Sequence, residues 1–129
     1  ISGEIPAYKV YEDDKVLAFL DITPVNPGHT LVIPKNHYND LLDLPEEEAK
    51  NLIAIIKKIT PAILLGTGAK GFNLGLNNGE VAGQVVGHIH FHIMPRFEAD
   101  GREPWHGQAY QEGEAQAIAE KIKSNLSNN

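Results

Sequence analysis

The sequence predicts an α+β domain, in which an antiparallel sheet of about five strands packs against one main helix and a second helix follows at the C-terminus. Short runs of β-branched and aromatic residues recur along the chain, and one long segment between the third and fourth runs has apolar residues at helical spacing. The 129 residues suit one domain, and a content of 42% hydrophobic and 22% charged residues is ordinary for a globular protein.

Each predicted strand is short and bounded by turn-forming residues. Asp13 and Asp14 separate the first two runs, which predicts a hairpin, and Pro34 ends the third. The predicted strands are Lys9–Glu12, Val16–Leu20, Thr30–Ile33, Asn73–Asn77 and His88–Met94.

The main helix is predicted from Pro45 to about Leu65. Pro45 in the first turn costs no helical hydrogen bond, and three glutamates follow it at the positive helix end. Pro61 is expected to kink or loosen the last turns, before Gly66 and Gly68 stop the helix. The predicted apolar stripe is Ala49, Leu52, Ile53, Ile56, Ile59 and Ile63. A weaker, mostly polar helix is predicted at Glu114–Leu126.

We find no repeat or linker, so residues 1–129 are interpreted as one domain, with a core at 1–97 and a C-terminal loop and helix at 98–129. The net charge of −6 argues against nucleic-acid binding, which needs a basic face. The longest unbroken apolar stretches, such as Leu52–Ile56, are far too short to span a bilayer. We therefore expect a cytoplasmic protein with neither a nucleic-acid nor a membrane partner.

Three histidines alternate with apolar residues at His88, His90 and His92. In a strand, residues two apart point to the same side, so the three imidazoles are predicted to share one face of the sheet. Three origins of this pattern are open at this point: a chance cluster on a solvated face, a metal site with imidazole ligands, and covalent catalysis by one neutral imidazole.

The segment before the histidines favours covalent catalysis on a phosphate. Residues 77–87 contain three glycines and two asparagines, which let the backbone approach a ligand and direct N–H groups at an anion. Taken alone, the segment is more typical of a plain hairpin loop. Beside the histidine array, we interpret it as a phosphate-binding loop.

These residues together resemble the histidine triad (HIT) family, and most closely its small prokaryotic members. The resemblance rests on the alternating histidines at 88–92, on Leu17–Pro24, on Gly28–His37, and on Asn77 and Gln84. It extends over nearly the whole chain to about Phe97. It implies a HIT-like fold and a nucleotide hydrolase or transferase, of the phosphoramidase or dinucleoside polyphosphate hydrolase type.

The resemblance also implies a role for each matching residue. His90 would attack the α-phosphorus and form a nucleotidyl-histidine intermediate, His88 would orient His90, partly through its backbone carbonyl, and His92 would bind the phosphate. His29 would support the three histidines from the adjacent strand. The implied substrate-binding residues are Asp21 for the ribose hydroxyls, Phe19 and Ile22 for the base, and Asn77, Gln84 and His92 for the phosphate oxygens.

Two departures from the family pattern bear on these expectations. Val85 stands where many relatives have a hydroxyl residue. The chain has no cysteine, so a structural zinc site built on His37 and His88 is expected only if cysteines precede Ile1. We otherwise expect that no cofactor is required, because a neutral imidazole is already nucleophilic near neutral pH. The resemblance further implies a homodimer in which strands of two subunits join into one larger sheet.

Overall fold

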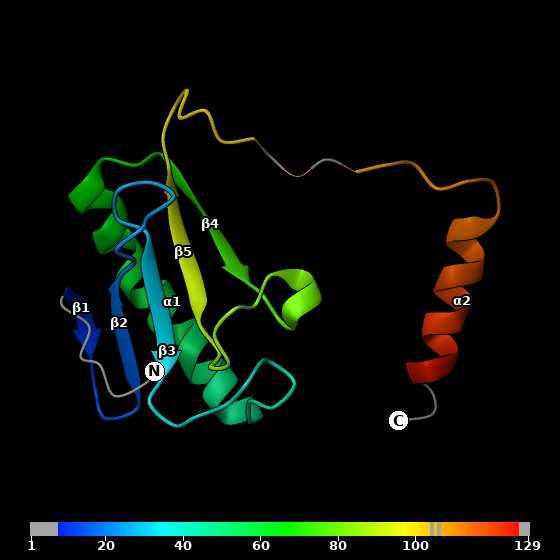
Figure 1. Cartoon of the computed structure of the whole chain (residues 1–129), viewed down its shortest axis with the longest axis horizontal. Helices are drawn as coiled ribbons and strands as arrows, with labels where there is room; N and C mark the ends of the chain where they lie inside the picture. The colour runs from blue at the N-terminus through cyan, green and yellow to red at the C-terminus, as the bar shows by residue number, and fades with distance from the viewer. Residues whose placement is uncertain (1–7, 104, 106, 127–129) are drawn as a thin grey trace.

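The computed structural model describes residues 8–103, 105 and 107–126. Five strands form one antiparallel sheet in the order β1-β2-β3-β5-β4, and a long helix covers one face of it (Figure 1). The strands are β1 (Lys9–Glu12), β2 (Val16–Leu20), β3 (Thr30–Pro34), β4 (Gly71–Leu76) and β5 (Phe91–Arg96). The helices are α1 (Glu46–Thr67), the short 3-10 helix η1 (Glu80–Ala82) and α2 (Glu114–Leu126). The predicted α+β class, with five strands and two α-helices, is confirmed.

The predicted hairpin is present between β1 and β2. Asp13 stabilises its turn, because its Oδ1 accepts hydrogen bonds from the backbone N–H groups of Lys15 and Val16, both at 2.8 Å. Its Oδ2 accepts from the hydroxyl of Tyr11 at 2.8 Å. These bonds keep the carboxylate charged, and they lower the pKa of Asp13 below 3.8, with the backbone bond from Lys15 the largest cause.

The helix α1 differs from the prediction at both ends. Pro45 is the residue before its first turn, and the helix passes through Pro61 to Thr67 without a break. Pro61 is exposed, so the carbonyl that it leaves unpaired lies on the solvent side, where water can satisfy it. Gly66 lies inside the helix, whereas Gly68 ends it with φ of 76° and an N–H bond to the carbonyl of Leu64.

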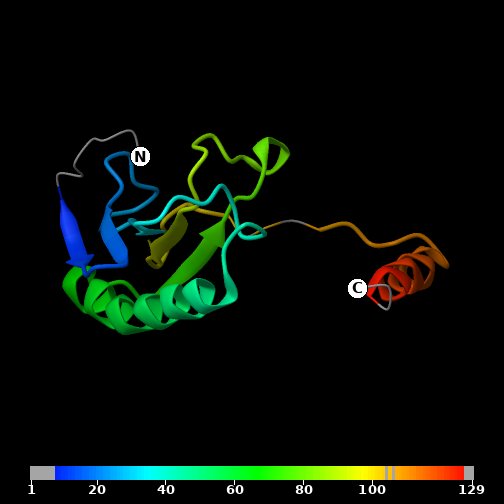
Figure 2. The ribbon, with the colours of Figure 1, turned by 90° about the horizontal axis from the view of Figure 1, so that it is seen from below.

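The buried face of α1 is turned slightly from the predicted stripe. Ile53 is 48% exposed, whereas Ile55 is 8% exposed and belongs to the core. The core is shared by α1 and the inner sides of β2, β3 and β5. Figure 2 shows α1 running beneath the sheet, so the opposite face of the sheet is left open for a site. The buried helix residues are Leu52, Ile55, Ile56, Ile59, Thr60 and Ile63.

Beyond β5 the chain leaves the sheet and carries α2 away from the body (Figure 1). None of the residues of α2 is buried. Asp100 fixes the start of this segment, because it accepts hydrogen bonds from the side chain of Arg96 and from the backbone N–H groups of Phe97 and Arg102. Among the described residues, no helix is long and apolar enough to cross a membrane.

Candidate active site

The histidine segment only partly forms a strand. The prediction placed a strand at His88–Met94, but β5 begins at Phe91 and continues to Arg96. The ladder between β3 and β5 ends at the pair Val32 and Phe91, so the next residues along the two strands, Ile33 and His90, are not paired with each other. The other half of the pattern is present: Ile89, Phe91 and Ile93 are buried in the core.

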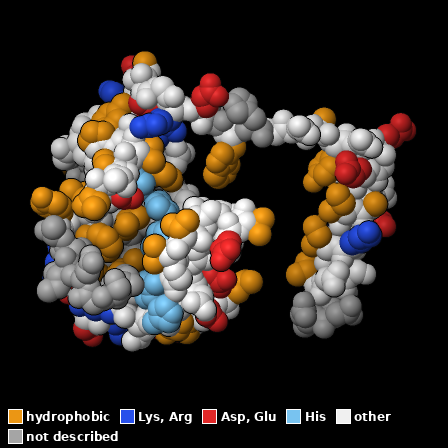
Figure 3. Space-filling view, viewed as in Figure 1, with side chains coloured by type: hydrophobic (Ala, Val, Ile, Leu, Met, Phe, Trp, Pro, Cys, Tyr) orange, Lys and Arg blue, Asp and Glu red, His pale blue; other side chains and the backbone are white. Residues whose placement is uncertain are grey.

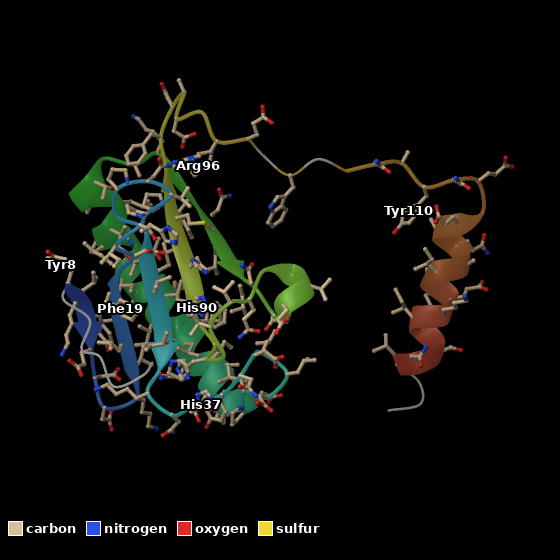
Figure 4. The ribbon with its side chains drawn as sticks, in the orientation of Figure 1. Tyr8, Phe19, His37, His90, Arg96 and Tyr110 are labelled. Carbon is tan, nitrogen blue, oxygen red and sulfur yellow. The ribbon has the colours of Figure 1, made fainter. Side chains whose placement is uncertain are left out.

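His90 lies just before β5 on the open face of the sheet, with Phe19 across the sheet on β2 and Arg96 at the far end of β5 (Figure 4). Its Nδ1 lies 2.8 Å from the backbone carbonyl oxygen of His88. A carbonyl can only accept a hydrogen bond, so Nδ1 of a neutral His90 carries the proton and Nε2 carries the free electron pair. This arrangement leaves Nε2 able to act as a nucleophile.

The side chain of His88 contacts His37 and Pro34, whereas the rings of His90 and His92 lie beside each other with centroids 5.0 Å apart. Nε2 of His88 donates to the carbonyl of Pro34 at 3.0 Å, and its Nδ1 lies 2.9 Å from Nδ1 of His37. His88 is 4% exposed. The bond to Pro34 satisfies one nitrogen of this buried imidazole, and the contact with His37 satisfies the other.

The pair formed by His37 and His88 was the expected half of a structural zinc site. Their rings stack with centroids 5.0 Å apart. A structural zinc needs four ligands, and the chain holds no cysteine to add to these two imidazoles. The residues present therefore do not complete a structural zinc site.

His29 supports His92 through a chain of hydrogen bonds. The backbone N–H of Val25 donates to Nδ1 of His29 at 3.0 Å, so Nε2 of a neutral His29 carries the proton. That Nε2 lies 2.9 Å from Nδ1 of His92, which must accept. Nε2 of His92 therefore carries a proton and is a hydrogen-bond donor, the form suited to holding a phosphate oxygen.

The surroundings keep these imidazoles neutral. Desolvation by burial lowers the pKa of His29, His88 and His92 below 6.5, and it is the largest cause for each of them. For His92 the neighbouring imidazoles of His90 and His29 lower the pKa further, while Asp21 opposes the shift. The tautomers deduced above for His29 and His92 thus apply at neutral pH.

Asp21, Phe19 and Ile22 lie on the β2 side of the histidines. Oδ1 of Asp21 accepts from the backbone N–H and the hydroxyl of Thr23, at 2.9 and 3.2 Å. Its Oδ2 faces His29 at 3.7 Å. Phe19 is partly buried and Ile22 is 79% exposed, so an apolar surface borders the carboxylate.

The predicted phosphate-binding loop follows β4 and holds itself together with its own side chains. Oε1 of Gln84 accepts from the N–H of Gly79 at 2.8 Å, and Nε2 donates to the carbonyls of Asn39 and Val86, at 2.6 and 3.0 Å. Gln84 therefore shapes the loop in this structure. Asn77 makes one long contact, 3.5 Å from Nδ2 to the carbonyl of Gly83, and Val85 is 91% exposed.

Two parts of this face were missed by the sequence reasoning. Thr23 and the N–H of Val25 fix the orientation of Asp21 and His29, but neither has a sequence signal apart from the turn-rich composition of residues 21–29. The second is a cavity of about 520 Å³ farther along β5, lined in part by Met94, Arg96 and Trp105. Continuing the alternation of His90 and His92 by one step would have placed Met94 on this face.

In space-filling view the histidines form a continuous band on this face, between the apolar surface of the body and the loop that carries η1 (Figure 3). A family model described as the HIT domain matches residues 2–99 of the chain. The chain belongs to the HIT family. HIT proteins of known structure share its architecture: a Bacillus subtilis member superimposes with a TM-score of 0.83 at 42% identity, covering 95% of this chain and 90% of that one.

Two relatives illustrate the similarity of the chain to other proteins. An uncharacterised HIT-like protein of Methanocaldococcus jannaschii is 56% identical over 101 residues, which are 78% of each chain. An adenosine 5'-monophosphoramidase of Schizosaccharomyces pombe is 38% identical over 128 residues, covering 98% of this chain and 93% of the relative. The expected resemblance is confirmed at the level of the family.

Proposed function

We propose that this protein is a nucleoside phosphoramidate hydrolase that works through a nucleotidyl-histidine intermediate. The observation that carries the proposal is the hydrogen bond from Nδ1 of His90 to the carbonyl of His88, at 2.8 Å, because it leaves Nε2 free to attack. Attack on the α-phosphorus forms a bond from phosphorus to Nε2 and breaks the bond to the leaving amine. Water then attacks the intermediate and releases the nucleotide.

His92 binds the phosphate in this mechanism. Its Nε2 is the donor, because Nδ1 is occupied by the hydrogen bond from His29. A donor placed before the reaction stabilises the charge that grows on the phosphate oxygens as His90 attacks. Oδ2 of Asp21 accepts from the ribose hydroxyls, and Phe19 and Ile22 contact the base. Asn77 and Gln84 bind phosphate oxygens once Gln84 exchanges its loop contacts for the ligand.

The charges beside His90 favour an amine over a nucleotide as the leaving group. The loop at residues 77–87 contains Glu80 and no Lys or Arg, and the neighbouring segment 36–44 contains Asp40 and Asp43 and no Lys or Arg. The two segments touch, because the N–H of Leu41 donates to the side chain of Asn78. A polyphosphate would bring several negative charges here without a cation to offset them. The monophosphoramidase activity in the name of the yeast relative agrees with this choice.

A substrate panel with a His90 variant tests the proposal. Adenosine and guanosine phosphoramidates are expected to turn over faster than dinucleoside polyphosphates. His90→Ala is expected to lose at least about 10³-fold in kcat while still binding AMP, since the nucleophile cannot be replaced by its neighbours. Full activity in the His90 variant would refute the nucleophile assignment. A wild-type protein that binds AMP but turns over no substrate would instead be a nucleotide-binding module.

We also propose that two copies join along β4, which lies at one end of the sheet order. Phe72 and Leu74 on this strand are 42% and 41% exposed, and an open strand edge readily pairs with another strand. Phe72→Asp is expected to shift the mass measured by light scattering from dimer to monomer, whereas a charge at the exposed Leu65 on α1 is not. A wild-type monomer at high concentration would refute this proposal.

A further inference from the structure

Three side chains, the phosphate-binding imidazole of His92 and two of its neighbours, bring metal-ligand atoms together. Nε2 of His29, Nδ1 of His92 and a carboxylate oxygen of Asp21 all lie within 4.8 Å of one another. Nε2 of His29 is 2.9 Å from Nδ1 of His92 and 3.7 Å from Oδ2 of Asp21. The proposed function uses each of these residues for another purpose and assigns no ion to them.

The spacing suits a tetrahedral ion. Ligands about 2.0 Å from a tetrahedral Zn²⁺ lie about 3.3 Å from each other. The two distances from Nε2 of His29 fall on either side of that value, and the third pair of ligand atoms lies within 4.8 Å, so an ion is seated when the carboxylate of Asp21 moves toward His92. Metal binding replaces the proton on Nε2 of His29, which is released to solvent, and Nδ1 of His92 already carries a free electron pair.

The ligand atoms are also held in place by the backbone. The N–H of Val25 occupies Nδ1 of His29, so only Nε2 of that ring can face an ion. Thr23 occupies Oδ1 of Asp21 through its N–H and hydroxyl, which leaves Oδ2 directed at His29. His29 is 4% exposed, and the side chain of Asp21 is 19% exposed, so water is largely kept from both. Ligands fixed in this way lose little freedom when an ion binds.

We propose that Asp21, His29 and His92 form a reversible inhibitory site for Zn²⁺ or a similar transition-metal ion. Two imidazoles and one carboxylate suit Zn²⁺, Cu²⁺ and Ni²⁺, whereas Mg²⁺ prefers an octahedral set of oxygens. Solvent completes the coordination on the partly exposed side of His92 and Asp21.

The inhibition follows from which atoms the ion takes, and this step rests on the proposed function. The ion occupies Oδ2 of Asp21, the oxygen that would otherwise accept from the ribose. It leaves the Nε2 proton of His92 in place for the phosphate, and it does not touch His90. The ion therefore competes with the nucleoside part of the substrate, raising KM while kcat at saturating substrate stays within about twofold of its metal-free value.

Binding is tested first, on the full chain and without any activity measurement. Titration calorimetry with ZnCl₂ compares wild type with Asp21→Asn, His37→Asn and the matched surface control Asp14→Asn. Asp21→Asn is expected to weaken Zn²⁺ binding at least about tenfold, because it replaces the one anionic ligand. The other two variants are expected to keep the wild-type affinity, and adenosine is expected to weaken Zn²⁺ binding to the wild type.

The outcomes separate this inference from the proposed function. If the His37→Asn variant loses the ion and the Asp21→Asn variant keeps it, the ion lies at the pair of His37 and His88, and the inference is overturned. The absence of any Zn²⁺ binding to the wild type would also overturn it. In the activity assay, Zn²⁺ is expected to raise KM and Mg²⁺ to leave it unchanged. Loss of activity on adding chelator would also overturn the inference, because the ion would then be a cofactor. If no phosphoramidate turns over, the proposed function fails while the calorimetry still tests the site.

Discussion

A single methyl group added at Gly28 tests how tightly the site is joined to the helix layer. Gly28 precedes His29 and has φ of 90°, where a residue with a Cβ is strained by about 1–2 kcal/mol. A Cβ at this position would lie 2.6 Å from Cγ2 of Thr67 and 3.2 Å from Cγ of Pro95.

The methyl of Thr67 cannot turn away freely, because the hydroxyl of that side chain donates to the carbonyl of Ile63 at 2.8 Å. Relieving the overlap therefore moves the backbone or breaks that bond, a penalty of about 1–3 kcal/mol for an overpacked contact. Together with the strain, Gly28→Ala is expected to lower the free energy of unfolding by about 2–5 kcal/mol.

Gly68→Ala is the matched control. Gly68 has φ of 76°, and a Cβ there would meet no atom within 4 Å. Gly68→Ala is expected to lower the free energy of unfolding by the backbone strain alone, about 1–2 kcal/mol. Urea denaturation followed by circular dichroism measures both variants. If the two losses agree within about 0.5 kcal/mol, the overlap argument is wrong.

Two further predictions concern the core and the buried imidazoles. Leu52→Ala is expected to cost about 2–5 kcal/mol in thermal or urea unfolding, because Leu52 is 1% exposed. Ile53→Ala on the 48% exposed side is expected to cost far less, and equal losses would contradict the assigned helix face. Burial lowers the pKa of His29, His88 and His92. At a pH between 6.5 and these lowered pKa values, the unfolded chain therefore binds more protons than the folded chain. The free energy of unfolding should therefore fall as pH drops below 6.5, and urea midpoints that stay constant from about pH 7 to about pH 5 would refute this.

The fold was predictable from the sequence wherever the local pattern alone decides the structure. The alternation of Ile89, Phe91 and Ile93 predicts an inner face, and the spacing of the helix apolar residues predicts one packed side. The exact buried stripe was not predictable, because Ile53 and Ile55 have identical side chains. Their difference comes from how α1 lies on the sheet.

The sequence predicts which residues form the candidate site, but it does not predict how they contact one another. The side chain of His88 contacts the carbonyl of Pro34 and the ring of His37, both far earlier in the chain. The form of His92 that donates to a phosphate depends on the N–H of Val25, two contacts away. Such effects need residues that are distant in sequence to be close in space, which no local pattern records.

The partner that sets the proton on His90 is a main-chain atom, and this limits what mutagenesis can reveal. Every residue placed at position 88 still carries a carbonyl, so an alanine scan there reports on the contacts with Pro34 and His37. The carbonyl itself can be weakened by an ester in place of the amide between residues 88 and 89. A semisynthetic chain with that exchange would weaken the acceptor for Nδ1 of His90 and leave every side chain unchanged, but it would also remove the N–H of Ile89 that donates to the carbonyl of Tyr38 at 2.8 Å.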